Sequence, residues 1–202
     1  MEEDPEIDYT IKLLIVGDSS IGKSNFIYRF IEDSFCEDYL TTSGIDLKTA
    51  NMKIKDKMIR VQLWDSAGQE KYRAITKNLF LKVLGALVFY DITNENSFNN
   101  LKEWVKSIKE ECGGHMQMII IGNKNDLEDK RVVEKDVAEA YAREQKIEYM
   151  ETSSKTGENV QEAIISLCEK ILKSEELSKD LSFTLDKSSF FFKEEKEMLL
   201  RN

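Results

Sequence analysis

A glycine-rich stretch near the amino terminus has the residue types and the spacing of a phosphate-binding loop. Gly17 to Ser24 read Gly-Asp-Ser-Ser-Ile-Gly-Lys-Ser, directly after an apolar run and directly before a helical pattern. A turn built on glycine lets several backbone N–H groups point at one phosphate, and the start of the following helix adds partial positive charge. We expect Lys23 to reach the β- and γ-phosphates of a nucleotide and the Ser24 hydroxyl to ligate Mg²⁺. The alternative is a glycine turn before an ordinary helix.

A second group of candidate residues ends a predicted strand and reads Trp-Asp-Ser-Ala-Gly-Gln-Glu from Trp64 to Glu70. An acidic residue that follows an apolar run, here Asp65, is placed to hold the direct ligands of Mg²⁺ without contacting the ion itself. Gly68 has no side chain to obstruct the approach of its backbone N–H to a γ-phosphate. Gln69 could orient an attacking water and stabilise charge, since an amide is not a strong base. Alone, Asp65 would be interpreted as a turn or capping aspartate.

The polar segment between these motifs contains two threonines, Thr41 and Thr42. A threonine here could bring its hydroxyl to Mg²⁺ and its N–H to the γ-phosphate. The spacing does not distinguish Thr42 from Thr41, and an ordinary loop threonine is a serious alternative. The residues that we expect around the phosphates in the first motif are Gly17, Asp18, Ser19, Ser20, Ile21, Gly22, Lys23, Ser24 and Asn25.

Two polar tetrapeptides, each after a predicted strand, have the groups needed to recognise a base. In the first, the Asp126 carboxylate can accept two hydrogen bonds from the N1–H and exocyclic amine of guanine, a donor pair that adenine lacks. Lys124 can lay its aliphatic stem along the base, and Asn123 can tie this loop to the phosphate loop. In the second, from Thr152 to Lys155, backbone N–H groups can reach guanine O6. The residues included from this loop are Ser153, Ser154 and Lys155.

These motifs need a scaffold that brings their loops to one edge. Strands are expected at Ile11–Val16, Ile59–Trp64, Ala86–Tyr90, Met118–Ile121 and Tyr149–Thr152, with an edge strand between Ile45 and Met58. Helical patterns cover about Gly22–Phe30, Phe98–Cys112, Glu134–Gln145 and Val160–Leu172. The alternation predicts an α/β fold of three layers, with a doubly wound, mostly parallel six-stranded sheet. Ligands of such sheets bind at the carboxyl ends of the strands.

Composition restricts the function further. The chain has 202 residues, of which 41% are apolar and 33% charged, as in a soluble globular domain. A net charge of −9 argues against binding nucleic acid or an anionic membrane through bulk charge. Three separated cysteines, Cys36, Cys112 and Cys168, are typical of free thiols in a reducing compartment and do not fit a zinc site. No run approaches the roughly 18 apolar residues of a membrane span.

The motifs together resemble those of the Ras-like small GTPases, and within them most closely the Rab family. The resemblance covers about Tyr9 to Leu172 and implies a P-loop NTPase G domain that binds GTP or GDP with Mg²⁺. It selects Thr42 as the Mg²⁺ threonine, places Phe35 against the guanine ring, and includes Tyr39 among the nucleotide-binding residues. It also implies hydrolysis of GTP to GDP and phosphate, with Gln69, Thr42 and Lys23 as the catalytic set.

A switch between two nucleotide states implies partners: an exchange factor, a GTPase-activating protein and effectors, with the chain itself a monomer. No intrinsic arginine finger is evident, so slow hydrolysis accelerated in trans is expected. By resemblance, the process is intracellular vesicle traffic. One alternative is a module that holds nucleotide without turnover, which the retention of Gln69 and Thr42 disfavours. Another is a phosphate-loop kinase or ATPase, which Asp126 disfavours.

Some positions depart from the Rab pattern. Ser20 replaces the usual glycine, and of the three positions Leu47, Trp64 and Leu79, at which Rab effectors usually meet aromatic residues, only Trp64 is aromatic. We expect an acidic extension over residues 1–8, the GTPase domain over 9–173 and a flexible tail over 174–202.

The end of the sequence also bears on localisation. The chain as given carries no cysteine near its end, so prenylation is not expected. Two apolar clusters, Phe190–Phe192 and Met198–Leu200, could contact a membrane or a partner, although a solvated tail is the favoured interpretation. We expect a cytoplasmic protein, with peripheral binding to endomembranes without a prenyl anchor as the other possibility.

Overall fold

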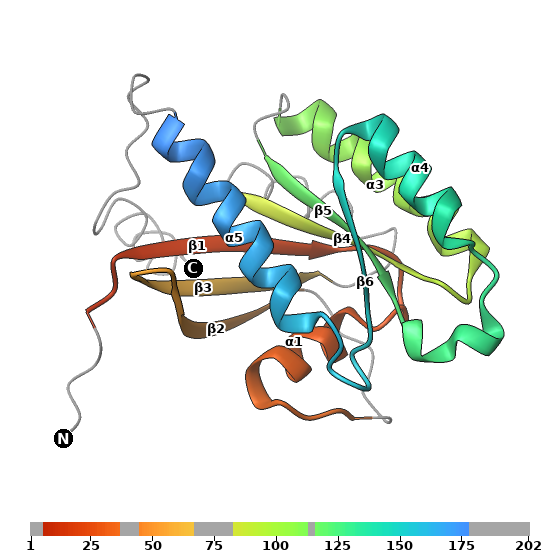
Figure 1. Ribbon diagram of the computed structural model, residues 1–202, viewed down its shortest axis with the longest axis horizontal. Coiled ribbons are helices and arrows are strands. Elements are labelled where there is room, and N and C mark those ends of the chain that lie inside the picture. Colours follow the sequence, from red (N-terminus) through yellow and green to blue (C-terminus); the bar gives the residue numbers. More distant parts are fainter. Residues whose placement is uncertain (1–5, 37–44, 67–82, 113–115, 178–202) are drawn as a thin grey trace, which may run out of the picture.

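The strands and helices alternate along most of the chain, as the sequence predicts. The computed structural model describes residues 6–36, 45–66, 83–112 and 116–177 (Figure 1). The strands are β1 (Tyr9–Val16), β2 (Ile45–Ile54), β3 (Lys57–Ser66), β4 (Gly85–Asp91), β5 (Gln117–Asn123) and β6 (Glu148–Thr152). The helices are α1 (Lys23–Glu32), α3 (Glu95–Cys112), the 3₁₀ helix η2 (Asn125–Lys130), α4 (Lys135–Gln145) and α5 (Val160–Leu177).

The six strands form one sheet in the order β2-β3-β1-β4-β5-β6. Only β2 runs antiparallel to its neighbour among the pairs described, and the others are parallel. Helices α1 and α5 cover one face of the sheet, while α3 and α4 cover the other (Figure 1). The predicted three-layer, doubly wound architecture is therefore confirmed.

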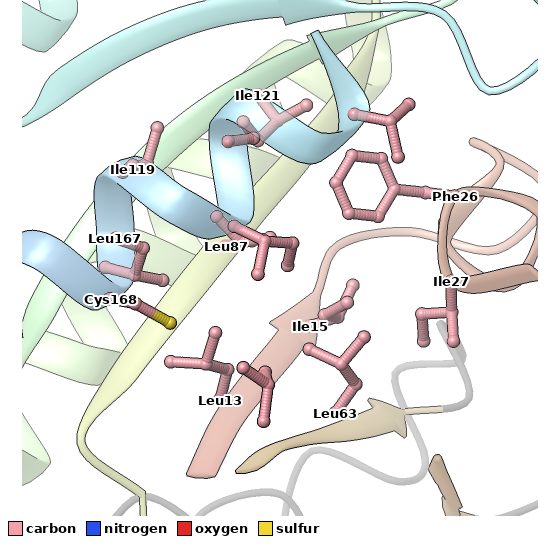
Figure 2. Packing of buried hydrophobic residues seen from close by; sticks show 14 of the residues in the cluster. Leu13, Ile15, Phe26, Ile27, Leu63, Leu87, Ile119, Ile121, Leu167 and Cys168 are labelled. Atoms are coloured by element: carbon pink, nitrogen blue, oxygen red, sulfur yellow. The ribbon is translucent and has the colours of Figure 1, made fainter. Parts of the chain in front are cut away.

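The core is built from the continuous apolar runs that predict parallel strands. Every residue of β4 is buried, because helices cover both faces of the sheet at this strand. On one face, Phe26 of α1 and Leu167 of α5 pack over side chains of β1, β3, β4 and β5 (Figure 2). The rings of Phe26 and Phe89 meet edge to face with their centroids 5.0 Å apart. Burial of both faces thus fixes the central strands rigidly beneath the loops that follow them.

Helix ends differ from the predicted ends for local reasons. Helix α3 begins at Glu95 rather than near Phe98, since the Asn94 side chain accepts the N–H of Ser97 (3.2 Å) and caps the first turn. Helix α5 continues past the predicted end at Leu172 to Leu177, beyond the domain limit expected at residue 173. The 3₁₀ helix after β5 was not predicted. None of the helices in the described ranges is both long and apolar enough to cross a membrane.

The register aligns the carboxyl ends of the parallel strands. Asp91 lies opposite Asn123, and Asn123 lies opposite Thr152. Asp65 lies opposite Ile15, one residue before β1 ends. The loops that follow β1, β3, β4, β5 and β6 consequently leave the sheet along one edge, where a ligand of this type of fold is expected to bind.

Candidate functional site

The loop between β1 and α1 has a backbone shape that two glycines permit. Gly17 and Gly22 adopt φ values of 138° and 94°. A Cβ atom on Gly17 would lie 2.5 Å from the Phe89 carbonyl oxygen, and one on Gly22 would lie 2.5 Å from Asn123 Nδ2. Any side chain at either position would therefore push the loop away from the ends of β4 and β5. Ser20 adopts the left-handed conformation at φ 64° without being a glycine.

Donors from the base loops hold the carbonyl groups of this loop. Asn123 Nδ2 donates to the Ile21 carbonyl (2.8 Å), and Lys124 Nζ donates to the Ser20 carbonyl (3.1 Å). In a trans peptide, the carbonyl and the next N–H point in opposite directions. The N–H groups that follow these carbonyls therefore point away from the base loops, as required of a loop that surrounds a phosphate.

Lys23 lies buried at the start of α1, where only 5% of the residue is exposed. Its Nζ donates to the Asp18 carbonyl (2.6 Å). Burial lowers the pKa of Lys23 to about 8, and the carboxylates of Asp65 and Asp18 oppose this shift. A phosphate beside the ammonium would favour its charged form. The environment of Lys23 thus fits an anionic ligand.

Ser24 and Asp65 come together at the predicted metal position. The Ser24 hydroxyl donates to Asp65 Oδ2 (2.5 Å), and Asp65 is 3% exposed at the end of β3. A hydroxyl and a carboxylate are hard oxygen donors, which Mg²⁺ prefers. The donor set therefore fits Mg²⁺ bound beside the phosphates, with Ser24 as a ligand and Asp65 behind it.

The two base loops lie against each other. Ser153 Oγ donates to Asp126 Oδ1 (2.6 Å), which joins the loop after β6 to the loop after β5. The fully buried Asn123 accepts from Thr152 Oγ1 (3.1 Å) and Ser154 Oγ (3.3 Å). The Lys155 N–H belongs to the loop whose N–H groups were expected to reach guanine O6. It instead donates to Ser153 Oγ (3.1 Å) within the loop. The structure thus brings together the predicted base-site residues.

The phosphate loop, the Ser24–Asp65 pair and the two base loops are the parts of a guanine-nucleotide site, and a comparison with protein families tests this interpretation. Residues 12–173 match the Ras family model. The chain belongs to the Ras family. The family expected from the motifs is thereby confirmed, together with the fold class.

Individual relatives place this Ras-family protein among the Rab-like members. It is 45% identical to Ras-related protein Rab-13 of Rattus norvegicus, over 82% of this chain and 81% of the relative. It is 42% identical to GTP-binding protein YPTM1 of Zea mays, over 84% and 81% of the two chains. GTP-binding protein ypt1 of Schizosaccharomyces pombe is 39% identical over 83% and 82%.

The predicted site of this Ras-family protein also includes residues from the segment between α1 and β2 and from the segment after β3. Tyr39, Thr42, Gly68 and Gln69 lie outside the described residues. Phe35 is described and is partly buried just beyond α1. Their roles in nucleotide binding or hydrolysis stay predictions.

Four residues that support the site were not predicted, namely Asn100, Trp104, Arg29 and Asp91. The Asp18 side chain accepts from Asn100 Nδ2 (2.7 Å) and Trp104 Nε1 (3.5 Å), which ties the phosphate loop to α3. Arg29 of α1 donates to the carbonyls of Ser154 (3.0 Å) and Lys155 (2.7 Å). Asp91 pairs with Lys124 at the end of β4. The signal that selected Asp65, an acidic residue after an apolar run, would also have found Asp91.

A buried polar network supports the base loops from behind. Glu151 accepts from Arg131 Nη1 (2.9 Å) and from the Tyr149 hydroxyl (2.6 Å), which lies 2.8 Å from the Tyr90 hydroxyl. Burial raises the pKa of both tyrosines, so their hydroxyls remain protonated and available as donors. This network joins the residue that follows η2 to β6 and, through Tyr90, to β4.

Proposed function

We propose that this Rab-like protein is a molecular switch that binds GTP and GDP with Mg²⁺ and hydrolyses GTP to GDP and phosphate. The observation that carries the proposal is the position of Asn123. This buried side chain bonds to the phosphate loop at Ile21 and to the base loop at Thr152. One residue therefore joins the two ends of a site that would hold a phosphate at one end and a base at the other.

In this proposal, the chain supplies binding, orientation and charge. The loop from Gly17 to Ser24 surrounds the phosphates with N–H groups, and the Lys23 ammonium offsets their negative charge. Mg²⁺, held by Ser24 with Asp65 behind it, supplies further charge stabilisation at the β- and γ-phosphates. Asp126 accepts the two donors of guanine.

The remaining roles fall on residues beyond the described ranges. Thr42 and Gly68 contact the γ-phosphate, and Gln69 orients the attacking water. Loss of the γ-phosphate removes the contacts that hold the segments around Thr42 and Gly68, so that partners distinguish the two states. Rab-like membership supports a role in intracellular vesicle traffic, with an exchange factor, a GTPase-activating protein and effectors as partners. The protein would act as a cytoplasmic monomer, with peripheral binding to endomembranes to be tested.

The proposal is tested with the purified full chain. Fluorescent GDP should bind in the presence of Mg²⁺, and unlabelled GTP should displace it while ATP does not. Single-turnover release of phosphate from bound GTP should be slow in the wild type and slower still in Gln69→Leu, whose nucleotide affinity is retained.

The matched control is Gln161→Leu, which makes the same replacement on the exposed side of α5 and should hydrolyse GTP as the wild type does. Equal competition by ATP and GTP would refute the guanine site. Tight GTP binding without phosphate release, even with an activating protein, would instead identify a module that holds nucleotide without turnover.

A further inference from the structure

The carboxylate of Asp91 has a different partner on each of its two oxygens. Asp91 is the last residue of β4 and is 5% exposed. Its Oδ1 accepts from the N–H and the hydroxyl of Thr93 (2.8 Å and 2.7 Å), which forms the turn toward α3. Its Oδ2 pairs with Lys124 Nζ at 2.6 Å. One oxygen therefore shapes the turn, and the other is committed to a residue of the predicted base site.

Lys124 connects Asp91 to the phosphate loop. The same Nζ that pairs with Asp91 also donates to the Ser20 carbonyl (3.1 Å). The Lys124 backbone holds a left-handed conformation at φ 68°, directly after β5. The backbone and the ammonium are thus both fixed, so the four-carbon stem between them is held across the space between β5 and the phosphate loop.

We propose that Asp91 is a positioning residue that slows nucleotide release by holding Lys124 in its binding conformation. The inference rests on the proposed function, in which the Lys124 stem lies along the guanine ring. A lysine side chain has many rotamers, and fixing it before the ligand arrives removes an entropic penalty from binding. The buried Asp91 carboxylate supplies this restraint, and the Ser20 carbonyl extends it to the loop around the phosphates.

The variant Asp91→Asn separates the two functions of the carboxylate. Its amide oxygen can still accept from Thr93, while its amide nitrogen replaces Oδ2 and presents a donor to the Lys124 ammonium. We expect GDP to dissociate about tenfold faster than from the wild type, because a charged hydrogen bond is lost. Thr93→Val is the matched control, since it removes the hydroxyl bond to Oδ1 and keeps the pair with Lys124. Its dissociation rate should stay within about twofold of the wild type.

A double variant tests whether Asp91 acts through Lys124. Lys124→Met keeps the apolar stem and removes the ammonium, so adding Asp91→Asn to it should produce little further change in the dissociation rate. Rate increases that multiply in the double variant would overturn the proposal. An unchanged rate in Asp91→Asn, or an equal increase in Thr93→Val, would overturn it as well.

A readout in the nucleotide-free protein keeps this inference separate from the proposed function. Acetylation by an amine-reactive ester, followed by mass spectrometry, measures the accessibility of Lys124. Labelling of Lys124 should accelerate several-fold in Asp91→Asn and remain at the wild-type rate in Thr93→Val, while labelling of exposed Lys173 stays constant in both. Unchanged labelling of Lys124 in Asp91→Asn would refute the restraint. Absence of guanine-nucleotide binding by the wild type would refute the proposed function instead.

Discussion

Lys23 carries an ammonium group that has been removed from water, and this makes nucleotide affinity sensitive to pH. Burial lowers its pKa to about 8 in the protein without ligand, and phosphates would raise the pKa again. Below about pH 8, Lys23 is charged in both states, so its contribution to affinity is constant. As pH rises above that value, binding takes up a proton and the affinity falls, by at most about tenfold per pH unit.

Calorimetry of GDP binding in buffers of different ionisation enthalpy measures this proton uptake. The measurement is made at pH 8.5, which lies below the pKa of the guanine base. Net proton uptake at that pH, and little at pH 7, is the expected result. Binding that takes up no proton at pH 8.5 would contradict a lowered pKa of Lys23 in the protein without ligand.

The Asp126 carboxylate sets the expected choice of base. Its Oδ1 is held by Ser153 (2.6 Å), so the carboxylate is oriented before a base arrives. Asp126→Asn presents an amide donor where guanine also presents donors, and it should favour xanthine, whose second carbonyl accepts a hydrogen bond. Competition with xanthosine and guanosine diphosphates measures the preference, which we expect to shift by at least about a hundredfold. Asp129→Asn, an exposed carboxylate in the same short helix, should leave it unchanged.

At the residue scale, the sequence predicts two kinds of group with unequal success. It predicts the groups expected to contact a ligand, but it misses most of the groups that hold those side chains in place. Lys23, Ser24 and Asp65 follow from motif spacing and from position at the end of a strand. Arg29 gave no such signal, since its bonds to the loop after β6 join segments far apart in the chain. Contacts of that kind depend on how the helices pack onto the sheet, which a local pattern does not encode.

Among the elements, α5 is the one whose packing is most directly testable. Leu167 is fully buried between this helix and the sheet. Leu167→Ala should lower the free energy of unfolding by about 2–5 kcal/mol, because it leaves a cavity in a rigid core. Urea denaturation of the GDP-loaded protein measures the change. Lys173→Ala, on an exposed part of the same helix, should change stability by less than about 0.5 kcal/mol.

The central strands β1, β4 and β5 could be predicted because helices cover both faces of the sheet there, so that most of their residues are buried and apolar. The 3₁₀ helix η2 could not, because its six residues contain none that is buried and so present no apolar period. The extra turn at the start of α3 was missed for a similar reason. Its first residues, Glu95 and Asn96, are exposed, and the Asn94 cap rather than apolar spacing decides where the helix begins.

For the molecule as a whole, the reactivity of the Cys168 thiol reports whether the domain unfolds. It is fully buried in α5, and burial raises its pKa to about 12, so its thiol is unreactive while the domain is folded. In a Cys36→Ser/Cys112→Ser variant, labelling of the remaining thiol should therefore require unfolding. Bound nucleotide stabilises the folded state by mass action, so an excess of GDP of about a thousandfold over its dissociation constant should slow labelling by about the same factor.

A thiol-reactive dye followed over time at increasing GDP concentration provides the measurement. ADP at the same concentrations serves as the control ligand and should have no effect. Labelling that proceeds at one rate whatever the GDP concentration would mean that Cys168 is reached by a local motion rather than by opening of the core.

The central position of β1 has a consequence for how the protein is made. Of the six described strands, β1 is synthesised first, yet its two neighbours are β3 and β4, and β4 ends only at Asp91. Synthesis proceeds at about 5–20 residues per second, so the apolar segment Tyr9–Val16 waits several seconds for its pairing partners. Throughout that delay, the segment has no neighbouring strand beside it, and its apolar side chains can associate with other apolar surfaces. Slowing translation ahead of β4 would prolong the exposure and reduce the yield of folded protein.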